Sequence, residues 1–107
     1  MIQKVNATGL SALLKNDASK DILLLDVREG HEFETGHLRG AVNIPLSIFE
    51  KEFARLPRDR LIVVICRIGH RSKPAAKLLA ARGYGKVICL RGGMFAWKRH
   101  MKDNLII

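Results

Sequence analysis

The chain has 107 residues, of which 48% are hydrophobic and 27% charged, and its formal net charge is +9. This length predicts one domain spanning residues 1–107, with a single core and no room for a second. The longest apolar run, residues 61–66, is too short for a membrane span. Polar residues near the N-terminus argue against a signal peptide, so we expect a cytoplasmic protein that does not associate with membranes.

The chain contains two cysteines, Cys66 and Cys89. Two are too few for a disulfide-stapled secreted fold or a four-ligand zinc site, which predicts free thiols in a reducing compartment. The four histidines show none of the recurrent zinc-binding spacings. We therefore expect neither a metal ion nor another cofactor.

The charges are unevenly distributed. Residues 1–54 contain 6 Lys+Arg and 8 Asp+Glu, a net charge of −2, whereas residues 55–107 contain 13 and 2, a net charge of +11. Such a positive half attracts small anions and acidic partners. Aromatic side chains that could stack on bases are few in this half, so nucleic acid is the less favoured partner.

Short apolar segments alternate along the chain with segments of helical periodicity. This alternation predicts an α/β fold with about five mostly parallel strands and helices on both faces of the sheet. The strands are expected at residues 3–5, 22–25, 41–44, 61–65 and 86–90. The helices are expected after an N-cap at Thr8, after an N-cap at Ser47 with Ile48, Phe49, Phe53 and Leu56 inward, from Ser72 to before Gly83, and over residues 94–101, with one short helical turn within residues 29–40.

The strand expected at residues 61–65 contains only Leu, Ile and Val, which is typical of a strand buried on both faces. Cys66 follows it directly, and Ser72 is a good N-cap for the next helix. In parallel α/β sheets, ligand sites form beyond the carboxyl ends of the strands, where backbone N–H groups favour anions. We therefore expect Cys66 at the mouth of an anion-binding site.

The five residues after Cys66 also favour a reactive cysteine. Arg67 and Arg71 supply positive charge that favours the thiolate, and Gly69 lets the backbone turn inward. Taken alone, a cysteine that ends an apolar strand is more often an inert part of the core. An inert cysteine has no need of two arginines, a glycine and His70 immediately after it, so the functional interpretation is preferred.

Four segments, in the same order, resemble those of a single-domain rhodanese. They are LLDVRE at residues 24–29, EF and GHLRGAVNIP within residues 32–45, CRIGHRS at residues 66–72 and LRGGMFAW at residues 90–97. Each segment alone is a moderate signal, whereas four in register are strong. The resemblance covers nearly the whole chain and implies a rhodanese-like domain.

The resemblance implies a thiosulfate sulfurtransferase-like enzyme. Cys66 would attack the outer sulfur of thiosulfate or of a related persulfide donor, release sulfite and hold the sulfur as a persulfide until a thiophilic acceptor removes it. The loop residues would bind the substrate, the backbone N–H groups cradling the sulfur and the two arginines holding the oxyanion end of the donor. These residues are Arg67, Ile68, Gly69, His70, Arg71 and Ser72. His70 is expected either to orient a donor or acceptor or to be a solvent-facing spacer.

Residues outside the loop are expected to support it. The resemblance implies that Asp26 and Arg28 pair beneath the loop, and a structural ion pair is preferred over direct catalysis. His37 is interpreted as a loop anchor. Cys89 lies in an apolar run and is expected to pack in the core, although a resolving thiol beside Cys66 stays an alternative.

Two other functions stay open. A cysteine phosphatase or arsenate reductase would also use a thiolate in an anion-binding loop, but such loops place five residues between cysteine and arginine, and here four separate Cys66 from Arg71. The domain could also be a persulfide carrier or partner-binding module without free thiosulfate turnover. The partners expected from these hypotheses are a small anionic sulfur donor and a thiol acceptor or sulfur-relay protein.

Overall fold

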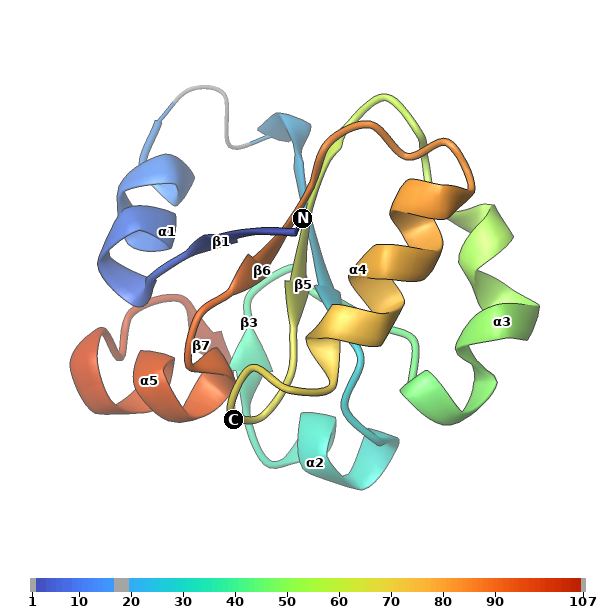
Figure 1. Cartoon of the computed structure of the whole chain (residues 1–107). Coiled ribbons are helices and arrows are strands. Elements are labelled where there is room, and N and C mark those ends of the chain that lie inside the picture. Colours follow the sequence, from blue (N-terminus) through green and yellow to red (C-terminus); the bar gives the residue numbers. More distant parts are fainter. Residues whose placement is uncertain (1, 17–19, 107) are drawn as a thin grey trace.

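The computed structural model describes residues 2–16 and 20–106, whose main feature is a five-stranded sheet (Figure 1). Every strand pairing in this sheet is parallel. Across the sheet the strands follow the order β1 (Gln3–Val5), β6 (Val87–Leu90), β5 (Leu61–Ile65), β2 (Ile22–Asp26) and β4 (Val42–Asn43). The predicted α/β fold with a parallel sheet is confirmed, and β5 occupies its centre.

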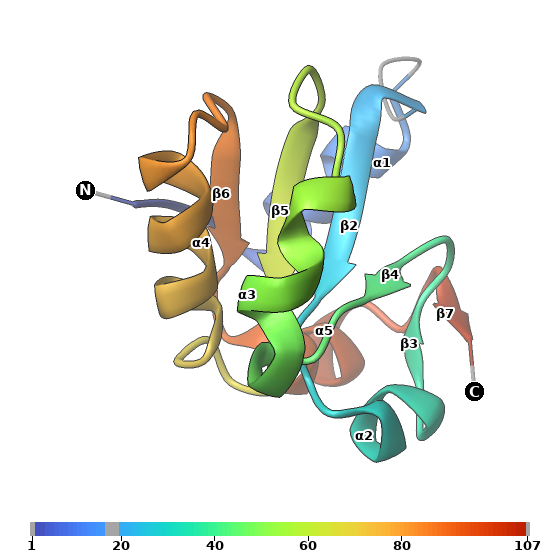
Figure 2. The same ribbon diagram turned by 90° about the vertical axis from the view of Figure 1, so that its right-hand side faces the viewer.

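Helices cover both faces of the sheet (Figure 2). One face carries α4 (Ser72–Ala81) and the helical segment of residues 46–55, which comprises a 3-10 turn (Leu46–Ile48), α3 (Phe49–Glu52) and a second 3-10 turn (Phe53–Arg55). The other face carries α1 (Ala7–Leu14) and α5 (Gly93–His100). None of the helices formed by the described residues is long and apolar enough to cross a membrane.

Alternate residues of β5 enter two separate cores. Ile62 and Val64 pack on the α4 side, whereas Val63 and Ile65 pack on the α5 side, and all four side chains are fully buried. Burial on both faces explains why this strand has no polar alternation. Cys66, one residue beyond the strand, belongs to the core on the α4 side.

The connection after β2 contains α2 (Gly30–Glu34), which confirms the expected short helical turn. Beyond it, β3 (His37–Leu38) pairs antiparallel with β7 (Leu105–Ile106) to form a small second sheet. This pair was not predicted, because two residues are too few to show the period of a strand.

The helix caps predicted at Thr8 and Ser47 were wrong. Helix α1 begins at Ala7, and the side chain of Asn6, not of Thr8, accepts a hydrogen bond of 2.7 Å from the Gly9 N–H. Ser47 lies inside a 3-10 turn, and its hydroxyl donates to the Glu29 carboxylate at 3.0 Å. Thr and Asn are similar capping residues, so the sequence pattern alone did not distinguish Thr8 from Asn6.

The helical segment of residues 46–55 differs from the prediction in one side chain. Phe49, Phe53 and Leu56 are buried as expected, but Ile48 is 45% exposed. The two 3-10 turns change the angle between successive side chains, so a single 3.6-residue period did not describe this segment.

The chain turns closely past the end of β5 at the start of α5. Gly93 has a φ of +57°, and a Cβ atom there would overlap the Cys66 carbonyl oxygen and lie 2.6 Å from the Arg67 carbonyl carbon. The N–H groups of Met94 and Phe95 donate to the Cys66 and Arg67 carbonyl oxygens, at 2.8 and 2.9 Å. The missing side chain at Gly93 therefore lets α5 hold the residues that follow β5.

Replacing Gly93 by Ala should destabilise the fold, because the new methyl group meets backbone atoms that cannot rotate away. Gly40→Ala is a matched control, since Gly40 also has a positive φ, +80°, but a Cβ there would meet nothing within 4 Å. We expect Gly40→Ala to lower the free energy of unfolding by about 1 kcal/mol and Gly93→Ala by about 3 kcal/mol, measured by urea denaturation. Equal losses in the two variants would contradict the tight-contact explanation.

Candidate active site

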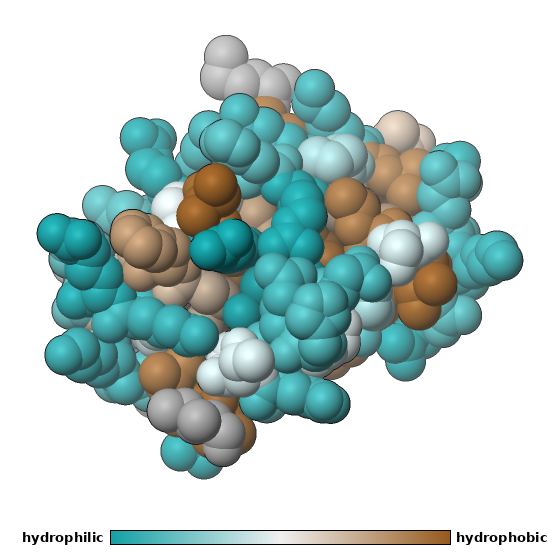
Figure 3. All heavy atoms as spheres, turned by 90° about the horizontal axis from the view of Figure 1, so that it is seen from below, coloured by the Kyte–Doolittle hydropathy of each residue, from teal (hydrophilic) through white to brown (hydrophobic). Residues whose placement is uncertain are grey.

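The candidate site lies at the carboxyl end of β5, at the bottom of Figure 1. Seen from below, this face is mainly hydrophilic, with separate hydrophobic patches (Figure 3). Within the loop that joins β5 to α4, the side chains of Arg67, Ile68 and His70 are exposed. Exposure of Ile68, at 49%, is unusual for an isoleucine and marks the loop as an accessible part of the surface.

The loop folds back onto the Cys66 sulfur. The Gly69 N–H donates a hydrogen bond to Cys66 Sγ over 3.0 Å. Gly69 has a φ of +101°, and a Cβ there would lie 3.3 Å from the Gly92 nitrogen, so a side chain at this position would strain the turn. A cradle of several backbone amides from Arg67 to Ser72 was predicted around the sulfur. Among the hydrogen bonds of the described residues, the one from a loop amide to the sulfur comes from Gly69.

The prediction that Cys66 lies at the mouth of the site was wrong. Its side chain is fully buried, with 0% exposure, and belongs to the core on the α4 side, while the Gly69 N–H of the loop contacts its sulfur. Sequence patterns locate the end of the strand but not the path of the loop over it. The sulfur is therefore closed to solvent in this structure.

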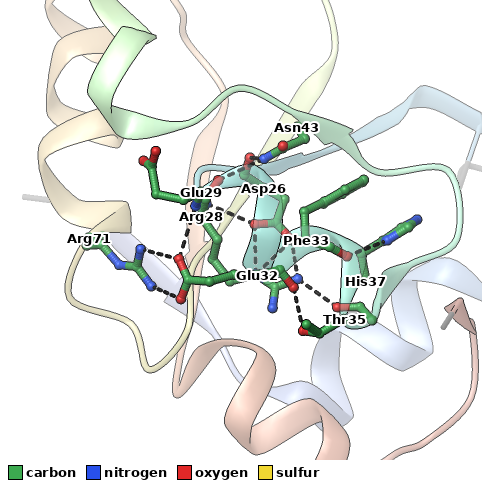
Figure 4. A network of polar contacts seen from close by, with 10 residues as sticks. Asp26, Arg28, Glu29, Glu32, Phe33, Thr35, His37, Asn43 and Arg71 are labelled. Atoms are coloured by element: carbon green, nitrogen blue, oxygen red, sulfur yellow. Dashed lines mark hydrogen bonds and ion pairs between the residues drawn. The ribbon is translucent and has the colours of Figure 1, made fainter.

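Arg71 is engaged by Glu32 of α2, as Figure 4 shows. The guanidinium makes a bidentate ion pair with the carboxylate, with N–O distances of 2.7 and 2.8 Å. The hydrogen bond to Arg71 lowers the pKa of Glu32 to about 2, against the opposing effect of burial, and the Glu29 N–H adds to the lowering. The same pair raises the pKa of Arg71, and the charge of a Cys66 thiolate adds to that rise.

This pairing gives Arg71 a role that the sequence did not predict. The guanidinium was expected to hold the oxyanion of the donor, but both of its terminal nitrogens bind Glu32. It still contributes positive charge near Cys66 while fixing the end of the loop to α2. No local signal could have found this pair, since 39 residues separate its members.

Ser72 closes the loop from the other end. Helix α4 begins at Ser72, so Arg71 is its N-cap and the predicted cap was one residue late. The Ser72 hydroxyl is buried and donates to the Gly69 carbonyl oxygen at 3.2 Å. Ser72 also lowers the pKa of the buried Cys89 thiol, against the larger effect of burial, so it lies between the loop and strand β6.

Asp26 and Arg28 form the expected ion pair, and both are buried. Arg28 donates from Nε and Nη2 to the two carboxylate oxygens at 3.0 and 2.8 Å, and Nη2 also donates to the Gly36 carbonyl oxygen at 2.8 Å. The Asn43 amide donates to the carbonyl oxygens of both residues (Figure 4). The pair thus joins β2, β4 and the connection after α2.

The histidines have separate surroundings. The His37 ring stacks on Phe33 with centroids 3.7 Å apart, and its Nδ1 is hydrogen-bonded to the Phe33 carbonyl oxygen, so it anchors the connection as predicted. His70 is exposed on the loop. Within the described ranges, 2–16 and 20–106, no group of three or more histidine, cysteine or acidic side chains could hold a metal ion.

Cys89 lies on the same face of the sheet as Cys66 but not opposite it. Val64 is the residue of β5 that pairs with Cys89, and Cys66 lies two residues further on. This offset separates the Cα atoms by roughly 8 Å, beyond the reach of an unstrained disulfide. Burial is the main cause that raises the pKa of the Cys89 thiol, which favours a packing role.

Two hollows flank the loop. The larger, about 370 Å³, lies beside Arg67, Phe95 and Lys98, with Glu32 and Arg28 at its wall. The smaller, about 150 Å³, lies beside Ile68, Gly69 and His70. Cys66 lines neither hollow, so the loop separates the sulfur from both.

The ion pair between Glu32 and Arg71 should stabilise the protein in a pH-dependent way. Because the Glu32 pKa is lowered from 4.5 to about 2 in the folded state, its contribution is present above pH 4.5 and is lost as the pH falls toward 2. At pH 7 we expect Glu32→Gln to lower the free energy of unfolding by about 2 kcal/mol, measured by urea denaturation.

The decrease in the free energy of unfolding caused by Glu32→Gln should become smaller as the pH falls from 4.5 to 2. Glu34→Gln is the control, because Glu34 lies in the same helix but is exposed. A loss for Glu32→Gln that stays constant down to pH 2, or that Glu34→Gln reproduces, would contradict the role of this ion pair.

Comparison with known proteins identifies the family of this chain. The family model described as "Rhodanese-like domain" matches residues 8–100. A sulfurtransferase of Allochromatium vinosum is 36% identical over 100 residues, which cover 94% of this chain and 92% of that protein. The thiosulfate sulfurtransferase GlpE of Shewanella oneidensis is 32% identical over 89 residues, 83% of this chain and 88% of that protein.

The solved structures agree. The crystal structure of a rhodanese-related protein from Thermoplasma volcanium superimposes with a TM-score of 0.86 at 29% identity, covering 97% of each chain. In a longer adenylyltransferase/sulfurtransferase the matched region makes up 24% of the protein, so the same domain also occurs within larger chains. With its parallel sheet, its cysteine loop and its matched residues 8–100, this chain belongs to the rhodanese-like domain family.

Proposed function

We propose that this protein is a sulfurtransferase that carries sulfur as a persulfide on Cys66. The observation that carries the proposal is the hydrogen bond from the Gly69 N–H to Cys66 Sγ. An amide that points at the sulfur stabilises negative charge on it, which both a thiolate nucleophile and a persulfide anion require. Relatives named as sulfurtransferases support the same chemistry.

The transfer step balances without a cofactor. The Cys66 thiolate attacks the outer sulfur of thiosulfate, a new S–S bond forms on Cys66, and the S–S bond of the donor breaks. Sulfite leaves with the electron pair of that bond, and the enzyme holds a persulfide anion. A thiol acceptor then attacks the terminal sulfur of the persulfide and regenerates the Cys66 thiolate.

Thiosulfate is proposed as the sulfur donor because of the positive charge of the chain and the name of one relative. The name of the Shewanella oneidensis relative includes thiosulfate, and the net charge of +9 favours a small anion. The acceptor is proposed to be a small thiol or the thiol of a sulfur-relay protein, in a reducing compartment such as the cytoplasm. A persulfide carrier without free turnover would also form the Cys66 persulfide, but it would not release the sulfur rapidly to a small thiol.

Phosphatase activity is not favoured by the loop. Four residues lie between Cys66 and Arg71, and the guanidinium of Arg71 is committed to Glu32. A tetrahedral phosphate needs a wide ring of donors, whereas a short loop with one amide on the sulfur suits a single added atom.

Incubation with thiosulfate should add the mass of one sulfur atom to the intact protein. The added mass should disappear on treatment with a thiol and should be absent from Cys66→Ala. Intact-protein mass spectrometry measures all three, and circular dichroism checks that the variant is folded. Addition of sulfur to folded Cys66→Ala would place the reaction on another residue and overturn the proposal.

Replacing Cys89 by Ser should leave persulfide formation and turnover within about twofold of the unsubstituted protein, because Cys89 packs in the core and is too far from Cys66 for a disulfide. The rate of sulfite release from thiosulfate is the measurement. A collapse of turnover in a protein that keeps its unfolding midpoint would instead support a resolving thiol.

A further inference from the structure

The smaller hollow beside the loop is lined by positive charge. Its volume is about 150 Å³. No carboxylate lines it. The lining residues come from β1, the loop, the first turn of α4 and the end of β6, and they are Lys4, Ile68, Gly69, His70, Lys73, Cys89, Leu90, Arg91 and Gly92.

The sheet register brings these groups to the cysteine loop. Lys4 of β1 pairs with Cys89 of β6, so their side chains lie on the same face of the sheet. Cys89 pairs in turn with Val64, and Cys66 lies two residues further along the same face. Helix α4 covers this face, which places Lys73 of its first turn above Lys4.

The cations of this hollow have no hydrogen-bonding or ion-pair partners among residues 2–16 and 20–106. The side chains of Lys4, Lys73 and Arg91 are exposed, and among the described residues no hydrogen bond or ion pair engages any of them. The charges of Lys4 and Lys73 nevertheless reach inward, because both lower the pKa of the buried Cys89 thiol, against the larger effect of burial. Unpaired like charges around a hollow repel one another, and a bound anion would relieve that repulsion.

The larger hollow differs from the smaller one in the charged residues that line it. Its wall includes the Glu32 carboxylate, and Arg28 in that wall is already paired with Asp26. Of the two arginines expected to hold the donor, Arg71 is bound to Glu32, and Arg67 lines this larger hollow together with Lys98, beside the carboxylate. The smaller hollow, which Gly69 itself lines, carries its positive charge with no carboxylate in its lining.

We propose that the hollow formed by Lys4, Lys73 and Arg91 binds the sulfonate end of a doubly charged inorganic sulfur donor such as thiosulfate. This inference rests on the proposed sulfur transfer and names the group of residues that receives the donor. The outer sulfur of the donor then points toward Gly69 and Cys66. The departing sulfite keeps the electron pair of the broken S–S bond and carries two negative charges, so the same cations stabilise it as it leaves.

Reaction requires the segment of Ile68 and Gly69 to shift, because it lies between the hollow and the buried sulfur. Gly69 provides the conformational freedom for this movement. Exposed Ile68 loses no core contact when the segment moves.

The relative rates of Cys66 alkylation by iodoacetate and iodoacetamide test the anion site directly. One reagent is negatively charged and the other is neutral, and both need the same opening of the loop, so the ratio of their rates isolates attraction of the anion. We expect Lys4→Gln and Lys73→Gln each to lower this ratio about threefold and the double variant about tenfold. Peptide mass mapping assigns the alkylation to Cys66.

Lys77→Gln is the matched control. Lys77 lies four residues after Lys73 on α4 and lines a neighbouring hollow, but not the one beside Gly69. The control should leave the ratio within experimental error. A double variant at Lys4 and Lys73 with an unchanged ratio, or a fall of equal size in Lys77→Gln, would overturn the proposed site, since it would leave only the general charge of the surface.

Steady-state kinetics provide a second test of the proposed anion site. For thiosulfate, with two charges, Lys73→Gln should raise KM about fivefold with kcat changed less, whereas for methanethiosulfonate, with one charge, the rise in KM should be smaller. An equal effect on both donors would contradict the site while leaving persulfide formation intact. Failure of the unsubstituted protein to form a persulfide would instead refute the sulfur transfer, and the alkylation ratio would still report on the anion site.

Discussion

Two hydrogen bonds from the start of α5 hold the residues on which the candidate chemistry depends. The N–H groups of Met94 and Phe95 bind the carbonyl oxygens of Cys66 and Arg67, and Gly93 allows this approach because it has no side chain. The first N–H groups of any helix have no partner within the helix. At the start of α5, the carbonyl oxygens of Cys66 and Arg67 accept hydrogen bonds from two of these groups, so helix and loop stabilise each other. The backbone of Cys66 is thereby fixed between the central strand β5 and the last helix α5.

Three further contacts determine the shape of the loop. Glu32 binds Arg71, the Ser72 hydroxyl binds the Gly69 carbonyl oxygen, and the Gly69 N–H binds the Cys66 sulfur. The contacts join the loop to α2 and α4 and leave Ile68 and His70 exposed at its tip. A loop held at its base but exposed at its tip preorganises the sulfur without many contacts at the tip that would oppose opening.

Charge in the site is divided between paired and unpaired groups. Arg28 and Arg71 are bound to carboxylates and hold the backbone, whereas Lys4, Lys73 and Arg91 have no such partners among the described residues. A paired guanidinium fixes geometry, while an unpaired cation is available to a ligand. Arg71, Lys73 and Arg91 belong to the strongly basic second half of the chain, which thus serves both the structure of the loop and the proposed attraction for anions.

The amino-acid sequence by itself determined the order of the strands along the chain, the central buried strand and the position of Cys66 at its end. These features follow from neighbouring residues, because hydrophobic period and spacing are local properties of the chain. The pair of Asp26 and Arg28 was implied by the resemblance of the sequence motif and not by its period. The tertiary structure alone decided that Cys66 is buried, that Arg71 binds Glu32 and that Lys4 lies near Lys73. Each of these depends on strand register and on contacts between distant segments, and no period in a single stretch of sequence encodes them.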